Sequence, residues 1–240
     1  PYLRNKTTMK NILIAGAGKG IGLALAKQLA DHEQVTAITR SASVELENTR
    51  AIVHYADLTK EDALHGIALP EILDGLVYCP GSINLKPFTR MQAGDFLHDF
   101  ELNVLGAIRL VQQCLPALRR SNSASVVLFS TVAAKLGMPF HSSVAVSKSG
   151  VEGLVKSLAA EYAANRIRFN AIAPSLVASD LSATLLNTAE KRENAAKRHP
   201  LQRIGNTNEV ATLAAFLLSD EAGWITGQVI GIDGGIGSLK

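Results

Sequence analysis

The sequence has few cysteines, no long apolar run and almost no excess of either charge. Of its 240 residues only Cys79 and Cys114 are cysteines, with no CxxC spacing and no histidine partner. We therefore expect ordinary buried thiols, rather than a disulfide or a metal site. No apolar run reaches the ~18 residues of a membrane span, and no signal-peptide pattern is present. These features predict a soluble, cytoplasmic protein with no metal and no membrane partner.

The charge balance also argues against a nucleic-acid partner. Counting 24 Lys and Arg against 21 Asp and Glu gives a formal charge of +3 at pH 7, which is too small for a basic nucleic-acid surface. Two of the cations, Arg4 and Lys6, lie in residues 1–8, which show no periodic pattern and precede Met9. We expect 1–8 to be a cloning remnant or a disordered leader. Residues 9–240 are long enough for a single α/β domain.

Seven short β-type runs alternate with helical patterns. The β-type runs are 12–15, 35–39, 51–55, 75–79, 125–130, 167–172 and 228–232, and the helical patterns are 20–31, 93–118, 143–164 and 207–218. This alternation predicts an α/β fold with a Rossmann-type, doubly wound parallel sheet of about seven strands and helices on both faces, in three layers. Pro116 is expected to end or bend its helix. The polar, charge-rich segment 175–200 is either a lid over the site or a solvated surface helix.

A glycine-rich turn follows the first predicted strand. Gly16, Gly20 and Gly22 form a G-x-x-x-G-x-G pattern, whereas Ile21 breaks the G-x-G-x-x-G dinucleotide fingerprint. No Gly-Lys-Ser/Thr follows, which excludes a phosphate-loop NTPase. Glycine lets a pyrophosphate approach backbone N–H groups at a helix N-terminus. The pattern therefore predicts a dinucleotide site, with a plain tight turn as the alternative.

Charged residues near the first three strands indicate which dinucleotide binds. Arg40 follows the second strand in a turn without an acid, and Lys19 lies in the glycine loop. A guanidinium suits the 2′-phosphate of NADP, whereas NAD is usually held by Asp or Glu. Each cation alone is more typical of an exposed surface, but the two together favour NADP or NADPH over NAD. Asp57, after the third strand, either accepts a hydrogen bond from adenine or caps the following helix.

These motifs, with Asn103, Pro174, Ile225-Thr226-Gly227 and Asp233-Gly234-Gly235, resemble the classical short-chain dehydrogenase/reductase family. The resemblance runs from Lys10 to the C-terminus and is strongest to 3-oxoacyl-carrier-protein reductase-like members. It implies an NAD(P)(H)-dependent oxidoreductase for a small alcohol or carbonyl substrate, usually a homotetramer or homodimer. The implied cofactor-binding residues are Gly16, Gly18, Lys19, Gly20, Ile21, Gly22, Arg40, Asp57, Leu58, Gly81, Lys148, Pro174, Val177 and Ser179.

The catalytic set implied by the resemblance is incomplete. The family's Tyr-x-x-x-Lys appears here as Val144 followed by Lys148, and Thr131 stands at the position of a substrate-orienting serine. Asn103 matches the family's helix asparagine, which implies a water path to the lysine. The alternative for Lys148 is a partly exposed helix lysine. Other departures are Tyr78-Cys79-Pro80-Gly81 for Asn-Asn-Ala-Gly, Pro174-Ser175 for Pro-Gly, and Ser179 for threonine.

The loss of the tyrosine leaves two functional hypotheses. Valine has no proton to give, and general acid catalysis is worth about 10²–10⁴ in rate. His141 is the candidate replacement acid because histidine titrates near neutral pH, although a solvated loop histidine is the alternative. The expected catalytic residues are therefore Thr131, Lys148, Asn103 and His141 in an atypical oxidoreductase. The other hypothesis is an inactive NADP(H)-binding relative with a sensing or scaffold role.

The cofactor preference is testable by calorimetry. The parent protein should bind NADPH more tightly than NADH, because Arg40 and Lys19 suit the additional phosphate. Arg40→Ala should narrow that difference by weakening NADPH alone. Equal affinities of the parent protein for the two dinucleotides would contradict the assignment.

Overall fold

The computed structural model describes residues 9–239, so the expected leader at 1–8 lies outside the described residues. Seven parallel strands form one sheet in the order β3-β2-β1-β4-β5-β6-β9. The strands are β1 (Asn11–Ala15), β2 (Gln34–Thr39), β3 (Ile52–Tyr55), β4 (Gly75–Tyr78), β5 (Ala124–Phe129), β6 (Ile167–Pro174) and β9 (Val229–Ile232). All seven predicted strands are present, and the predicted fold class is confirmed.

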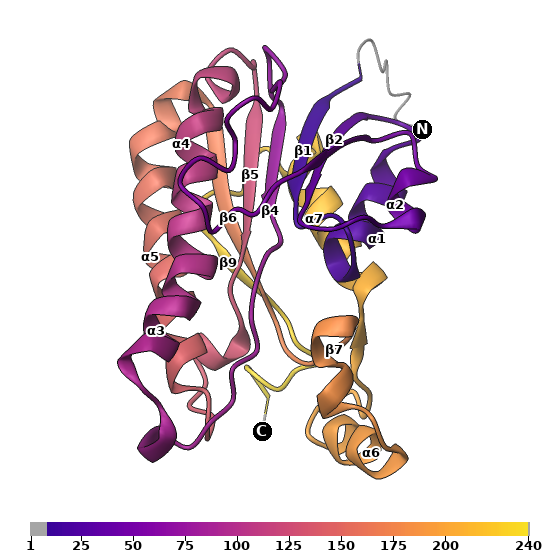
Figure 1. Ribbon diagram of the computed structural model, residues 1–240, viewed down its shortest axis with the longest axis vertical. Coiled ribbons are helices and arrows are strands. Elements are labelled where there is room, and N and C mark those ends of the chain that lie inside the picture. Colours follow the sequence, from indigo (N-terminus) through magenta and orange to yellow (C-terminus); the bar gives the residue numbers. More distant parts are fainter. Residues whose placement is uncertain (1–8, 240) are drawn as a thin grey trace.

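Helices cover both faces of this sheet (Figure 1). On one face lie α4 (Gly106–Leu118) and α5 (Ser142–Tyr162), and on the other lie α1 (Gly20–Leu29) and α7 (Thr207–Leu218). The shorter helices are α2 (Val44–Glu47), α3 (Ala93–Phe100) and α6 (Ala189–Lys197), and a separate small sheet joins β7 (Val177–Ala178) to β8 (Gly205–Asn206). Within residues 9–239, no helix combines the length and apolar character required to cross a membrane.

Alternate side chains of the central strands enter two separate cores. In β1, Leu13 and Ala15 pack in the core beneath α4 and α5, whereas Ile12 and Ile14 pack in the core beneath α1 and α7. Successive strand side chains point to opposite faces, so a sheet covered on both faces needs apolar residues at consecutive positions. This requirement explains the continuous apolar runs of the sequence.

The predicted helix 93–118 contains an irregular turn. Between α3 and α4 the backbone forms a π-helical turn, η2 (Glu101–Leu105), which carries the buried Asn103. Pro116 lies inside α4, which ends two residues later at Leu118. Single π turns are uncommon and often occur at functional sites. The turn places Asn103 against α5, where its amide reaches Ser147.

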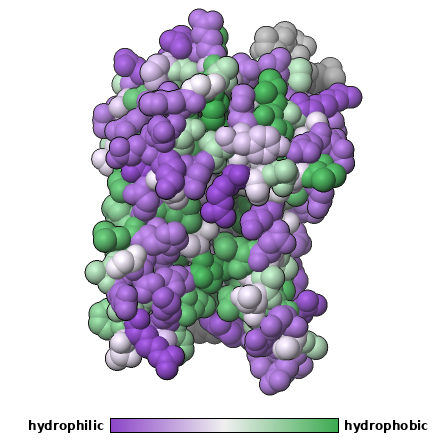
Figure 2. Space-filling model, in the orientation of Figure 1, coloured by the Kyte–Doolittle hydropathy of each residue, from purple (hydrophilic) through white to green (hydrophobic). Residues whose placement is uncertain are grey.

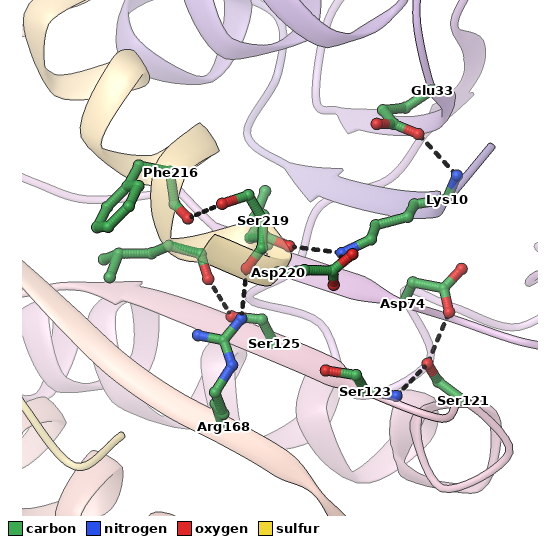
Figure 3. Close-up of polar contacts among 12 residues, drawn as sticks. Lys10, Glu33, Asp74, Ser121, Ser123, Ser125, Arg168, Phe216, Ser219 and Asp220 are labelled. Atoms are coloured by element: carbon green, nitrogen blue, oxygen red, sulfur yellow. Dashed lines mark hydrogen bonds and ion pairs between the residues drawn. The ribbon is translucent and has the colours of Figure 1, made fainter. Parts of the chain in front are cut away.

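Polar contacts join the chain at the amino-terminal edge of the sheet (Figure 3). Lys10, just before β1, forms an ion pair of 2.5 Å with Asp220, which follows α7. Arg168 of β6 donates a hydrogen bond of 3.1 Å to the carbonyl oxygen of Ser219. These contacts connect the starts of two strands to the end of α7. The opposite, carboxyl-terminal edge is where the loops that carry the candidate site residues emerge.

A matched pair of leucine truncations tests the core assignment. Leu76 is fully buried in β4, whereas Leu97 of α3 is 69% exposed. Leu76→Ala should lower the free energy of unfolding by about 2–5 kcal/mol, because it removes buried methyl groups and leaves a cavity. Leu97→Ala should have almost no effect. Urea denaturation of both variants measures the difference, and equal losses would contradict the assignment.

Candidate functional site

The start of α1 and the loops after β4, β5 and β6 line a cavity of about 520 Å³ at the carboxyl edge of the sheet. Figure 2 shows hydrophobic residues gathered in the lower half of the face of the molecule in view, between the side that carries α3 and the side that carries α6. The predicted site residues that line the cavity are Ile21, Gly81, Thr131, His141, Lys148, Pro174, Val177 and Ser179. The predicted residues outside its lining are Gly16, Gly18, Lys19, Gly20, Gly22, Arg40, Asp57, Leu58 and Asn103.

Packing requires glycine at two positions, one in the loop after β1 and one in the first turn of α1. Gly16 has a φ of +76°, and a Cβ there would lie 2.9 Å from Pro80. A Cβ on Gly22 would lie 2.3 Å from the carbonyl oxygen of Gly16. A plain tight turn would have the same requirement, so these contacts alone do not indicate a ligand. The first turn of α1, however, has no side-chain cap from Lys19 and no acidic residue, and its free N–H groups fit a phosphate.

The residues after β2 and β3 lie beside one another. The exposed Arg40 is close enough for its charge to help lower the pKa of Asp57, although hydrogen bonds from Thr59 are the larger cause. Asp57 Oδ1 accepts these bonds from the Thr59 hydroxyl at 2.8 Å and the Thr59 N–H at 3.1 Å. The chain after Asp57 forms turns, so this carboxylate caps a turn, and the alternative of a helix cap is wrong. The side chain of Leu58 is buried in the core.

Lys148 lines the cavity and is almost fully buried. Its side chain is only 6% exposed, which overturns the alternative of a partly exposed helix lysine. Nζ donates a hydrogen bond of 2.8 Å to the carbonyl oxygen of Phe129, at the end of β5. Burial lowers the pKa of Lys148 to about 8, and the charge of Asp99 opposes this shift. Val144 lies one helical turn earlier and lines the same cavity, so the two residues share one face of α5.

Asn103 and Lys148 border one small space above Gly81. Asn103 Nδ2 donates to the carbonyl oxygen of Asp99 at 2.8 Å and to Ser147 Oγ at 3.2 Å. Its buried Oδ1 has no hydrogen-bond partner among the described residues. A Cβ built on Gly81 would lie 3.5 Å from both Asn103 Oδ1 and Lys148 Nζ. An unpaired acceptor and a buried ammonium on the same space provide two polar partners for a bridging water.

Two alternative proton donors differ in their access to the cavity. His141 immediately precedes α5, as expected for a loop residue, and its Nδ1 lies 2.7 Å from the carbonyl oxygen of Pro139. It lines the cavity. Tyr78 is buried, and its phenol donates a hydrogen bond of 2.6 Å to the carbonyl oxygen of Leu102. Burial raises the pKa of Tyr78, and it raises the pKa of the neighbouring Cys79 thiol to about 12. Both groups therefore stay protonated at neutral pH.

Two polar clusters at the cavity were not predicted from the sequence. The buried carboxylate of Asp99 accepts hydrogen bonds from Ser82 at 2.7 Å and from Ser143 at 2.6 Å. Ser175 lies 2.9 Å from His199, measured from Oγ to Nε2. Ser175 was visible in the sequence as a replacement for glycine. The other partners are far apart in the chain, and no local pattern connects them.

Comparison with known proteins identifies the family. A family model described as enoyl-(acyl carrier protein) reductase matches residues 16–237. The chain belongs to the short-chain dehydrogenase/reductase family. The 3-oxoacyl-[acyl-carrier-protein] reductase FabG of Staphylococcus aureus strain Mu50 is 31% identical over 242 residues, covering 95% of this chain and 98% of that protein. The relatives of this chain are dehydrogenases and reductases, so the chain is an oxidoreductase by family.

Two other relatives match this chain over different shares of their own length. A tropinone reductase homolog of Arabidopsis thaliana is 38% identical over 164 residues, which are 68% of this chain and only 63% of that relative. The crystal structure of a putative 2-deoxy-D-gluconate 3-dehydrogenase from Agrobacterium tumefaciens, with bound NADP, is 26% identical. It has a TM-score of 0.88 and covers 97% of this chain and 99% of its own. This structural similarity extends over nearly the whole chain.

The buried ammonium of Lys148 should make stability depend on pH. Its pKa is about 8 in the folded protein against an ordinary value of 10.5. Burial of the charged form therefore lowers the free energy of unfolding by its largest amount below pH 8, and this loss declines as the pH rises toward 10.5. Between pH 7 and pH 9.5 the parent protein should gain on the order of 2 kcal/mol relative to Lys148→Met.

Urea denaturation at the two pH values measures this difference. Lys156→Met on the same helix is the control, because Lys156 is exposed. Its stability relative to the parent protein should be the same at both pH values. If the difference in stability between Lys148→Met and the parent protein were also the same at both pH values, Lys148 would not be desolvated.

Proposed function

We propose that this protein binds NADP(H) and transfers a hydride between the nicotinamide and a small carbonyl or alcohol substrate. In this proposal Val144 takes the position of the family's tyrosine acid. The observation that carries the proposal is one cavity that brings together Thr131, Val144 and Lys148 with Ile21, at the start of α1 directly after the glycine loop. The substrate end and the phosphate end of a dinucleotide site are thereby joined on one sheet edge.

The electrostatics of the cavity support NADP(H) as the cofactor. The lining includes Lys148, Lys191 and Arg198, and none of the described lining residues is an Asp or Glu. The exposed Lys19 and Arg40 add positive charge beside the glycine loop. A positive, acid-free site favours a ligand that carries several phosphates. The NADP-bound relative from Agrobacterium tumefaciens is consistent with this choice.

The protein's own residues would hold and orient the reacting groups. The nicotinamide, when bound, supplies or accepts the hydride. Lys148 Nζ uses one donor on the carbonyl oxygen of Phe129, and an ammonium has two more for a ribose hydroxyl and a water. Thr131 offers its hydroxyl to the substrate, and Val144 offers an apolar surface. Binding and orientation are therefore retained, whereas the proton has to come from another group.

An inactive dinucleotide-binding protein is the alternative function. The observation that favours it is the apolar Val144 in the cavity lining, together with a buried Tyr78 whose phenol is committed to the carbonyl oxygen of Leu102. We favour the oxidoreductase because Lys148 is buried as a charged group, an arrangement that costs stability. The proposal also includes a cytoplasmic location and a homodimer or homotetramer. The exposed apolar side chain of Phe100, at the end of α3, fits such an assembly.

Restoring the phenol tests the position of Val144. Val144→Tyr should raise the rate of NADPH oxidation with diacetyl or acetoacetyl-coenzyme A, since Lys148 is in place to lower the phenol pKa. Val146→Tyr, at an exposed position of the same helix, is the control and should leave the rate unchanged. A Val144→Tyr protein that binds NADPH without any gain in rate would contradict the proposed position of the acid.

A further inference from the structure

A serine and a histidine from distant parts of the chain meet at the cavity wall. Ser175 directly follows β6, and His199 lies two residues beyond the end of α6. Ser175 Oγ and His199 Nε2 are 2.9 Å apart, and both residues line the cavity that contains Val144 and Lys148. The imidazole is only 4% exposed. The pair is therefore built into the wall rather than formed at a solvated surface.

The hydrogen bonds fix which imidazole nitrogen carries the proton. His199 Nδ1 lies 2.8 Å from the carbonyl oxygen of Ala195. A carbonyl oxygen only accepts, so Nδ1 is the protonated nitrogen. In the neutral ring Nε2 then presents a lone pair, to which the Ser175 hydroxyl donates. A hydroxyl coupled to a base that a third group orients is the usual arrangement for proton transfer from an oxygen.

Strand register places Ser175 beside the hydroxyl expected to orient the substrate. Phe129 of β5 pairs with Ile172 of β6, so Thr131 lies opposite Pro174. The Thr131 hydroxyl is 3.5 Å from the carbonyl oxygen of Pro174. Ser175 is the next residue, and it also lines the cavity. Thr131 and Ser175 are thus carried by adjacent strand ends and line one cavity.

His141 lacks the hydroxyl partner that His199 has. Its Nδ1 is likewise directed at a carbonyl oxygen, that of Pro139. Among the described residues, however, no hydroxyl is hydrogen-bonded to its Nε2, and the ring is more exposed than that of His199. Gly234 packs against His199, because a Cβ on this glycine would lie 3.3 Å from the histidine Cβ. His199 is therefore the better fixed of the two imidazoles.

We propose that Ser175 is the catalytic proton-transfer residue of this site and that His199 is the positioning residue that exchanges the proton with it. The inference rests on the proposed oxidoreductase function, in which the nicotinamide dinucleotide is the hydride partner. During alcohol oxidation the substrate O–H proton moves to Ser175 Oγ, while the Ser175 proton moves to His199 Nε2. The carbinol carbon loses its hydride and the C–O bond becomes a carbonyl. During reduction the same proton returns from His199 through Ser175 to the carbonyl oxygen.

Kinetics of two variants at saturating NADPH test this assignment. Ser175→Ala removes a single oxygen atom and should lower kcat for diacetyl reduction by about 10²–10⁴ without changing the NADPH Kd. His199→Ala should lower kcat similarly, and added imidazole should restore much of the loss, which a purely structural role would not allow. Ser157→Ala and His65→Asn, at exposed positions, are the controls and should match the parent protein.

Histidine nitrogen NMR gives a readout that does not depend on turnover. In the parent protein the His199 ring should be protonated on Nδ1, and the Nε2 resonance should shift in Ser175→Ala while the signals of His141 stay in place. An unchanged Nε2 resonance would show that the two side chains are not hydrogen-bonded in solution.

The kinetic outcomes separate this inference from the proposed function. Loss of kcat in Ser175→Ala with unchanged NADPH binding supports the pair. Three results overturn the pair and leave dinucleotide binding in place. These are an unchanged kcat in Ser175→Ala, a loss of kcat confined to His141→Ala, and a parent protein that binds NADPH but reduces neither diacetyl nor acetoacetyl-coenzyme A. Failure of the parent protein to bind NADPH overturns both.

Discussion

The continuous parallel hydrogen bonding of the central strands is the constraint on which the candidate site depends. Because every strand of the large sheet runs in the same direction, each loop after a strand emerges at the same edge. The glycine loop after β1, Gly81 after β4, Thr131 after β5 and Ser175 after β6 therefore come together although they are far apart in the chain. The covering of both faces by helices fixes the strands, and the polar contacts at the opposite edge close that end of the sheet.

The burial of Lys148 connects this architecture to chemistry. Its ammonium is held by the carbonyl oxygen of Phe129 and borders the unpaired Oδ1 of Asn103 across the space over Gly81. A protein gains no stability from desolvating such a charge, so the arrangement is best explained by a ligand that uses it. In the proposed function, Val144 beside it takes the position of the family's proton donor. The hydrogen-bonded pair of Ser175 and His199 in the wall of the same cavity is our proposal for the oxygen and the base of that role.

Much of the fold was predictable because the signals are local. The apolar runs and the glycine loop place seven strands and the first helix, and the spacing from Thr131 to Lys148 places two polar residues in one cavity. The π-helical turn around Asn103 was not predictable, because it preserves the apolar pattern on both sides. The role of Asp57 in a turn and the burial of Lys148 depend on neighbours from other elements. The contact between Ser175 and His199 has no sequence signature, because it joins the residue after β6 to a residue two positions beyond the end of α6.

A crystal structure of the protein with NADP⁺ tests the central claim most directly. The account predicts the pyrophosphate on the N–H groups at the start of α1, the 2′-phosphate beside Arg40, and the nicotinamide ribose within hydrogen-bond distance of Lys148 Nζ. It further predicts that Ser175 Oγ faces the carbon that exchanges the hydride. A dinucleotide bound elsewhere, or bound with its nicotinamide away from Lys148, would contradict the account.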